Sequence, residues 1–221
     1  MSENGETKLT RTKRKWAEEG RFLTGDVATG HTAGRERLPP GQHLVKDWPV
    51  LDLGVEPEVP LDRWRLEITG FARNRTTLGW AAFTALPQHD LITDIHCVTT
   101  WSRYDNPWRG VLTRDLLALA EPMAEAEAGF VLLESADGYT TNLPLDDFAA
   151  ADAVLATHWN GAPLTREHGG PMRLVVPHLY FWKSAKWLTR IEFIGRDRAG
   201  FWERNGYHMR GDPWAEERYS D

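Results

Sequence analysis

The stretch Asp94-Ile95-His96-Cys97-Val98-Thr99-Thr100-Trp101-Ser102 decides the prediction of both the fold and the site. Residues Leu91 to Val98 have the composition of a β-strand, which would deliver Cys97 to the loop that follows. Cys97 is the only cysteine of the chain, so an internal disulfide is excluded. A single cysteine can be a small buried hydrophobic residue, a nucleophile or a ligand of a metal ion. This stretch therefore supplies the first candidate for chemistry.

The neighbouring His96 offers little support for a cysteine nucleophile. Adjacent residues on an extended strand point to opposite faces, so His96 is poorly placed to be the base of Cys97, which weakens a cysteine-dependent hydrolase. Zinc is also poorly supported, because one cysteine and eight histidines show no CxxC, no HExxH and no paired spacing. The sequence contains neither of the nucleotide-binding motifs GxxxxGK[ST] and GxGxxG, so it gives no support to a nucleotide-dependent enzyme.

The surrounding sequence predicts an α+β domain in which short helices are mixed irregularly among strands. Trp64, Leu66 and Ile68 share one face of a strand of period two that Gly70 closes. Further strands are predicted at 130–134, 139–143, 154–159, 172–176 and 187–194. Short helices are predicted at 80–86 and from Thr113, as its N-cap, to the residues before Pro122.

The bulk composition narrows the functional classes. A formal net charge of -6 and a pI near 5.8 argue against nucleic-acid binding, which needs a basic surface. The sequence has no apolar run long enough for a signal peptide or a membrane span, so we expect a cytoplasmic location. Residues 1–30 are polar and punctuated by glycine, which predicts an N-terminal arm followed by one domain at 31–221.

Two downstream segments gather cationic and small polar groups. They are His168-Gly169-Gly170-Pro171-Met172-Arg173 and Lys183-Ser184-Ala185-Lys186-Trp187. An arginine fork, a lysine point charge, a serine hydroxyl and backbone N–H groups together suit a phosphate-bearing cofactor. Each of these residues alone is unspecific, because surface arginine and lysine side chains are usually solvated.

Four motifs follow one another along the chain. They are Asp94–Ser102 with Trp108-Arg109-Gly110-Val111, then Glu167-His168-Gly169-Gly170-Pro171-Met172-Arg173-Leu174-Val175-Val176-Pro177, then Lys183-Ser184-Ala185-Lys186-Trp187-Leu188, and last Phe201-Trp202-Glu203-Arg204-Asn205-Gly206-Tyr207. In this order they resemble the molybdopterin-binding domain of the sulfite oxidase family. The resemblance extends to small bacterial members related to the catalytic subunit of periplasmic methionine-sulfoxide reductase. The loop after Cys97 is closer in character to these small members than to true sulfite oxidases.

The resemblance implies a fold, a cofactor and a set of site residues. The fold would be the sulfite-oxidase-type molybdopterin-binding domain, with mixed sheets and short helices. The cofactor would be Mo-molybdopterin, with Cys97 as the thiolate ligand of the metal, and soft thiolate ligation suits such a centre. The expected catalytic residues are Cys97, Tyr207 and Arg35. The expected cofactor-binding residues are Arg37, Cys97, Ser135, Asp137, His168, Arg173, Lys183, Ser184, Ala185 and Lys186.

The function implied in this way is two-electron oxygen-atom transfer on a small sulfur or nitrogen oxo compound. Tyr207 would lie beside the oxygen ligand of the metal, and Arg35 would attract the substrate. The partners would be this small molecule and an unidentified electron-transfer protein. A molybdopterin-binding module without catalysis of its own, or a partner subunit, stays open as the alternative.

Overall fold

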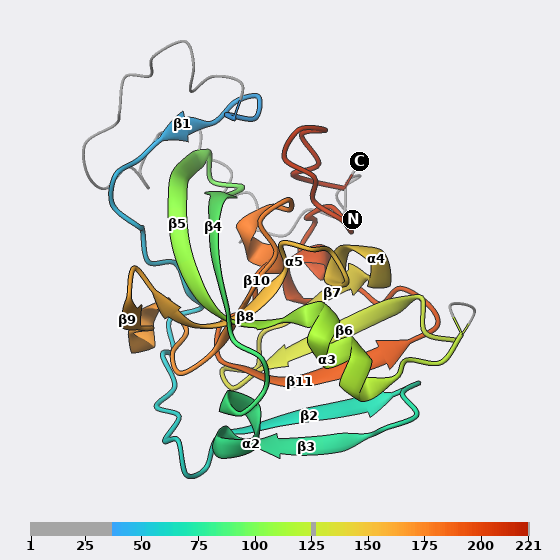
Figure 1. The fold of residues 1–221 in the computed structure, drawn as a ribbon. Helices are drawn as coiled ribbons and strands as arrows, with labels where there is room; N and C mark the ends of the chain where they lie inside the picture. Colours follow the sequence, from blue (N-terminus) through green and yellow to red (C-terminus); the bar gives the residue numbers. More distant parts are fainter. Residues whose placement is uncertain (1–36, 125–126, 221) are drawn as a thin grey trace.

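The computed structural model describes residues 37–124 and 127–220 and contains two mixed β-sheets (Figure 1). The first sheet has the order β1 (His43–Leu44), β5 (Trp101–Leu112), β8 (Val154–Trp159) and β10 (Arg173–Val175), with β4 (His89–His96) paired to β5 and β9 (Ala162–Pro163) paired to β8. The second has the order β3 (Thr76–Gly79), β2 (Arg65–Gly70), β11 (Leu188–Ile194), β6 (Phe130–Ser135) and β7 (Thr140–Pro144). Strands β1 and β5 are parallel, as are β2 and β11, and the other pairs are antiparallel. The prediction of mixed sheets is confirmed.

The helices are short. They are α2 (Trp80–Thr84), α3 (Thr113–Ala120), α4 (Leu145–Phe148) and α5 (Phe201–Arg204), with 3-10 turns η2 (Arg166–His168) and η3 (Phe181–Lys183). The prediction of Thr113 as an N-cap is wrong, because Leu112 occupies that position and Thr113 is the first helical residue. Its hydroxyl instead donates to the carbonyl oxygens of Phe148 and Ala153. None of the helices in 37–124 or 127–220 has the length and apolarity that a membrane span requires.

The period-two pattern around β2 is confirmed and marks one side of the larger core. Trp64, Leu66 and Ile68 are each 1% exposed or less, whereas Arg65 is exposed. These three side chains belong to a cluster of buried residues that also receives side chains from α3, β6 and β11. At about 25 cal/mol per Å² of apolar surface, such burial stabilises this end of the molecule against the loss of chain entropy.

The long β4–β5 hairpin positions Cys97. Figure 1 shows the two green strands rising side by side next to β1. Cys97 is the first residue of the turn between them, and its N–H donates to the carbonyl oxygen of Trp101 over 2.8 Å. The N–H of Thr100 donates back to the carbonyl oxygen of Cys97 over 3.0 Å. The sequence prediction of a strand that delivers this cysteine to a loop is therefore confirmed.

A polar cluster, which we call the His178 cluster, ties the loop after β10 to α4 and to the C-terminal segment. His178 meets Asp147 through Nε2 over 3.2 Å and Asp152 through Nδ1 over 3.1 Å. Arg210 forms two hydrogen bonds to the carboxylate of Asp147, of 2.9 and 3.0 Å. The two hydrogen bonds fix the orientation of the Arg210 guanidinium relative to the carboxylate of Asp147.

Candidate cofactor site

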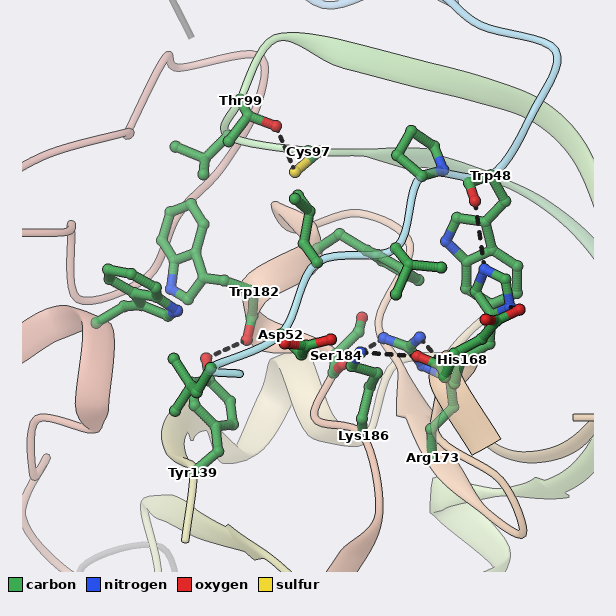
Figure 2. Close-up of a pocket in the computed structure, with 18 of the residues that line it drawn as sticks. Trp48, Asp52, Cys97, Thr99, Tyr139, His168, Arg173, Trp182, Ser184 and Lys186 are labelled. Atoms are coloured by element: carbon green, nitrogen blue, oxygen red, sulfur yellow. Dashed lines mark hydrogen bonds and ion pairs between the residues drawn. The ribbon is translucent and has the colours of Figure 1, made fainter. Parts of the chain in front are cut away.

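A cavity of about 890 Å³, counted to its open mouth, is lined by well-separated parts of the chain (Figure 2). The lining side chains come from segments 48–53, 97–101, 137–139, 167–187 and 202–207. Seven residues predicted from the sequence are among them, namely Cys97, Asp137, His168, Arg173, Ser184, Lys186 and Tyr207. The fold thus brings together motifs that lie more than a hundred positions apart. A lining drawn from five separate segments suits a cofactor rather than a single ion.

One end of the cavity holds the cysteine sulfur. Cys97 Sγ lies 3.1 Å from the hydroxyl oxygen of Thr99, and both are at the end of the cavity away from Lys186 (Figure 2). Tyr207 is 3% exposed, and its ring stacks on Trp202 with the centroids 4.9 Å apart. The ring of Trp182 meets Tyr207 edge-on at 5.0 Å. Because these rings fix one another, the phenol of Tyr207 has little freedom to move.

The other end is cationic. Arg173 is 3% exposed, and its guanidinium donates to the carbonyl oxygens of His168 over 3.1 Å and Ser184 over 2.6 Å. Lys186 Nζ donates to the carbonyl oxygen of Glu167 over 2.8 Å. Burial lowers the pKa of Arg173 to about 9, and burial together with the charge of Arg173 lowers the pKa of Lys186 to about 8. Since these hydrogen bonds end on neutral oxygens, both positive charges are available to an anion such as a phosphate.

His168 contributes an aromatic face and not a charge. Its ring lies 3.9 Å from that of Trp48, centroid to centroid. The carbonyl oxygen of Trp48, 3.3 Å away, can only accept from Nε2, which leaves Nδ1 to accept from the hydroxyl of Thr165 at 3.0 Å. Burial also lowers the pKa of His168, which favours this neutral form.

Asp137 and Ser184 line the cavity, and their side chains also accept hydrogen bonds from nearby backbone N–H groups. The carboxylate of Asp137 accepts a hydrogen bond of 3.0 Å from the N–H of Tyr139, which is the geometry of an Asx-turn. Burial raises the pKa of Asp137. The hydroxyl oxygen of Ser184 accepts from the N–H of Val176 over 2.9 Å, so its own proton can still be donated elsewhere.

Of the two N-terminal arginines predicted at the site, Arg37 is described by the structure and does not line the cavity. Arg35 lies outside the described residues, and its role stays a prediction. Arg37 is exposed, and its guanidinium forms ion pairs with Asp94 and Asp105. It also lies 4.3 Å from the centroid of the Tyr104 ring. Two carboxylates and an aromatic face hold Arg37 against the β4–β5 hairpin, and it is not among the residues that line the cavity.

Three other residues predicted to bind the cofactor are not among those that line the cavity. Lys183 is fully buried, and its ammonium donates to Asn142 over 2.9 Å and to Glu203 over 2.6 Å. Ser135 lies at the end of β6, outside the lining of the cavity. Ala185 packs into the larger core with 1% exposure. The fold thus places Lys186 at the cavity and turns Lys183 toward the buried Glu203.

One wall of the cavity, residues 48–53, was not predicted from the sequence. Residues 48–53 form no helix or strand, so no hydrophobic periodicity could predict their position, yet every one of them lines the cavity. Asp52 lies near the middle of the close-up, between the cysteine and the cationic end (Figure 2). The available signal was Trp48 before Pro49, a large aromatic side chain at the start of a rigid extended segment.

The cavity fits a molybdopterin in the chemistry of its two ends. A pterin with a phosphate tail needs a cationic end, which the buried Arg173 and the half-buried Lys186 provide. Its metal needs a soft ligand from the protein, and Cys97 lines the same cavity at the other end. The fold and the site together define an oxidoreductase that binds a molybdopterin.

Comparison with known proteins gives the family. Residues 53–202 match the model of the oxidoreductase molybdopterin binding domain. The oxidoreductase YuiH of Bacillus subtilis is 49% identical over 185 residues, which cover 83% of this chain and 92% of that protein. The chain therefore belongs to the sulfite oxidase family of molybdopterin-dependent oxidoreductases, and its cofactor is Mo-molybdopterin.

Longer relatives share only this domain. The catalytic subunit of the protein-methionine-sulfoxide reductase MsrP of Campylobacter jejuni is 30% identical over 157 residues, which cover 63% of this chain and 52% of that protein. The crystal structure of the sulfane dehydrogenase SoxCD of Paracoccus pantotrophus matches with a TM-score of 0.59 and 21% identity, over 68% of this chain and 42% of that chain. This chain thus spans about half the length of these two proteins. The structural match confirms the expected fold.

Proposed function

We propose that the chain carries out two-electron oxygen-atom transfer on a small sulfur or nitrogen oxo compound, with Cys97 as the protein ligand of molybdenum. The observation that carries the proposal is the single cysteine sulfur in a cavity whose opposite end holds the buried Arg173 and the half-buried Lys186. When bound, the molybdenum cofactor supplies the two-electron chemistry. The protein binds and orients the cofactor, excludes water and positions the substrate.

The cationic end holds the cofactor through its phosphate. Arg173 offers a planar fork, already fixed by carbonyl oxygens, and Lys186 adds a point charge. Neutral His168, whose ring lies against that of Trp48, presents an aromatic surface for the flat pterin, and Ser184 has a proton to donate. Because these groups are held before the ligand arrives, little ordering free energy is needed on binding.

Tyr207 is the proposed hydrogen-bonding partner of the reacting oxygen. It lines the cavity at 3% exposure, and stacking on Trp202 restrains its ring. A phenol can donate to or accept from an oxygen that leaves or joins the substrate. Arg35, as the group that attracts the substrate, stays a prediction.

The walls around the sulfur favour a neutral substrate over an anion. Among the described residues of the lining, the formal cations are Arg173 and Lys186, and both lie at the end away from Cys97. The cysteine end is walled by Thr99, Trp182 and other neutral side chains. Among the described residues no cation lines this end to meet an anion such as sulfite, which would lose hydration there, whereas an S-oxide needs only hydrogen-bond donors. The sulfoxide reductase named among the relatives is in keeping with this choice.

Metal analysis tests the proposal. Protein from a host that makes the pterin should contain molybdenum and release a pterin, and protein from a host unable to make it should contain neither. Cys97→Ala and Arg173→Ala should each reduce the molybdenum content, whereas Arg65→Ala, at an exposed arginine outside the cavity, should not. Undiminished metal in the first two variants would refute the assignment.

Turnover assays with artificial electron donors and acceptors address the substrate. A panel should compare S-oxides, N-oxides, sulfite and nitrate at equal concentration. We expect turnover with a neutral oxo compound, and turnover with sulfite alone would contradict the substrate class. Complete inactivity of molybdenum-loaded protein across the panel would favour the non-catalytic module. The electron-transfer partner, the cytoplasmic location and the single domain at 31–221 stay predictions.

A further inference from the structure

The turn that carries Cys97 is held from outside by hydrogen bonds to three of its carbonyl oxygens. Gln42 Nε2 donates to the carbonyl oxygen of Cys97 over 3.1 Å. The N–H of His43 donates to that of Thr100 over 2.9 Å. The carbonyl oxygen of Val98, between them, accepts from Nη1 of Arg218 over 2.8 Å. Two of these donors come from the start of the described chain and one from its end.

Arg218 joins three parts of the molecule at this point. Besides Val98, its guanidinium donates through Nη2 to the carbonyl oxygen of Pro40 over 3.1 Å. The guanidinium carbon also lies 4.9 Å from the centroid of the Tyr180 ring, within the range of a cation–π contact. A planar group with donors on two edges can make all three contacts at once, which a lysine ammonium cannot reproduce.

The loop at Pro40 and Gly41, which accepts a hydrogen bond from Arg218, leaves room for the guanidinium. Gly41 has a φ of +67°, a conformation that favours glycine, and a Cβ there would lie 3.2 Å from Nη2 of Arg218. The same Cβ would lie 3.4 Å from the carboxylate of Glu216. A side chain at position 41 would therefore press on the C-terminal segment.

Without these outer bonds the turn has little to fix its shape. Within the described residues its internal backbone bonds are those between Cys97 and Trp101 and between Thr100 and Cys97. Thr100 is held at a φ of +77°, which a β-branched residue adopts only when its surroundings impose it. The direction of Sγ follows from the backbone of Cys97. The carbonyl oxygen of Val98 belongs to the next peptide along the turn, so a rotation of that peptide would change the course of the turn and reach the sulfur through Val98.

We propose that Arg218 is a positioning residue that directs Cys97 Sγ into the cavity by holding the carbonyl oxygen of Val98. The inference rests on the proposed role of Cys97 as metal ligand, and it assigns to the C-terminal segment the task of completing the ligand loop. Arg218 touches neither the cofactor nor the substrate in this role.

The first test uses cofactor-free protein and measures the rate at which a small alkylating reagent modifies Cys97 at one fixed pH. Loss of a charge-assisted hydrogen bond should open the turn more often, so Arg218→Gln should be alkylated about tenfold faster than the unmodified chain. Arg218→Lys, which keeps the charge but not the fork, should fall between the two. The matched control is Arg65→Gln, since Arg65 also donates to two carbonyl oxygens, of Asp62 over 3.0 Å and Trp64 over 2.7 Å.

The second test uses loaded protein and counts the sulfur ligands of molybdenum by X-ray absorption. We expect Arg218→Gln to lose part of the protein sulfur signal while Arg65→Gln keeps it. Unchanged alkylation and unchanged sulfur ligation in Arg218→Gln would overturn the proposal, as would equal effects in the control. The ligand role of Cys97 fails by a different result, undiminished molybdenum and an unchanged sulfur count in Cys97→Ala, so the two failures are distinguishable.

Discussion

Replacing Lys183 by methionine should destabilise the protein even when no cofactor is bound. The ammonium has three N–H donors and lies within hydrogen-bond distance of four oxygens, which are the backbone and side-chain oxygens of Asn142, Oε1 of Glu203 and the carbonyl oxygen of Met209. Both Lys183 and Glu203 have side chains that are 0% exposed. Burial lowers the pKa of Lys183, while the charge of Glu203 opposes that shift.

The magnitude follows from what the substitution leaves behind. Glu203 Oε1 would keep the indole N–H of Trp182 at 2.9 Å and the hydroxyl of Thr141 at 3.2 Å, but its charge would be uncompensated in the interior. Breaking a buried ion pair on one side costs about 3–5 kcal/mol of unfolding free energy. With a urea m-value of about 2 kcal/mol per M, the midpoint of unfolding should fall by roughly 2 M.

Urea unfolding of cofactor-free protein is the assay. The double variant Lys183→Met with Glu203→Gln removes both charges, so it should be more stable than Lys183→Met alone. A loss of less than about 1 kcal/mol in Lys183→Met, together with a loss of molybdenum from loaded protein, would refute the reasoning. Lys183 would then bind the cofactor, as the sequence motif predicts.

Three further predictions concern other parts of the molecule. Burial acts to lower the pKa of His178, but its hydrogen bonds with Asp147 and Asp152 outweigh this and raise the pKa to about 9. The stabilisation by protonated His178 is therefore complete below about pH 6.5 and is lost as the pH rises through about 9. The difference in unfolding free energy between the protein and His178→Gln should therefore shrink by about 2 kcal/mol between pH 6 and 9.5, after discounting for partial exposure. A difference in thermal unfolding that stays constant over this range would contradict the prediction. In Gly110→Ala the new Cβ would lie 2.1 Å from the carbonyl oxygen of Leu155 in β8, so we expect a loss of at least about 2 kcal/mol, and an unchanged unfolding midpoint would argue against the register of β5 and β8. Tyr207→Phe should retain molybdenum and lose turnover, and unchanged turnover would remove the phenol from the mechanism.

Elements with strong local patterns could be predicted from the sequence. The alternation of Trp64, Leu66 and Ile68 identified β2, and the strand-like composition of Leu91 to Val98 identified β4. The twelve-residue strand β5 was missed, because its sequence, WSRYDNPWRGVL, contains Pro107 and several charged residues and does not alternate. Pairing with both β4 and β8, and not local preference, makes this segment a strand.

The short motifs predicted which segments form the site, but not which side chains of each motif reach the cavity. Lys183 and Lys186 belong to one motif and carry the same chemistry, yet the 3-10 turn Phe181–Lys183 sends the first into the interior and leaves the second at the cavity. Neither composition nor spacing shows which of the two lysines reaches the cavity, because the difference arises from the buried Glu203, which pairs with Lys183. The wall at 48–53 is likewise set by tertiary packing.

The first and last lining residues of the cavity, Trp48 and Tyr207, are separated by most of the chain, so the binding site exists only in the completed native state. A ligand selective for that state shifts the folding equilibrium by mass action, by about 4 kcal/mol at a thousandfold excess over its dissociation constant. Resistance to limited proteolysis should therefore distinguish loaded from empty molecules without any knowledge of the substrate. In a cell starved of pterin, the amount of this polypeptide should decline through turnover by proteases, with no change in its synthesis.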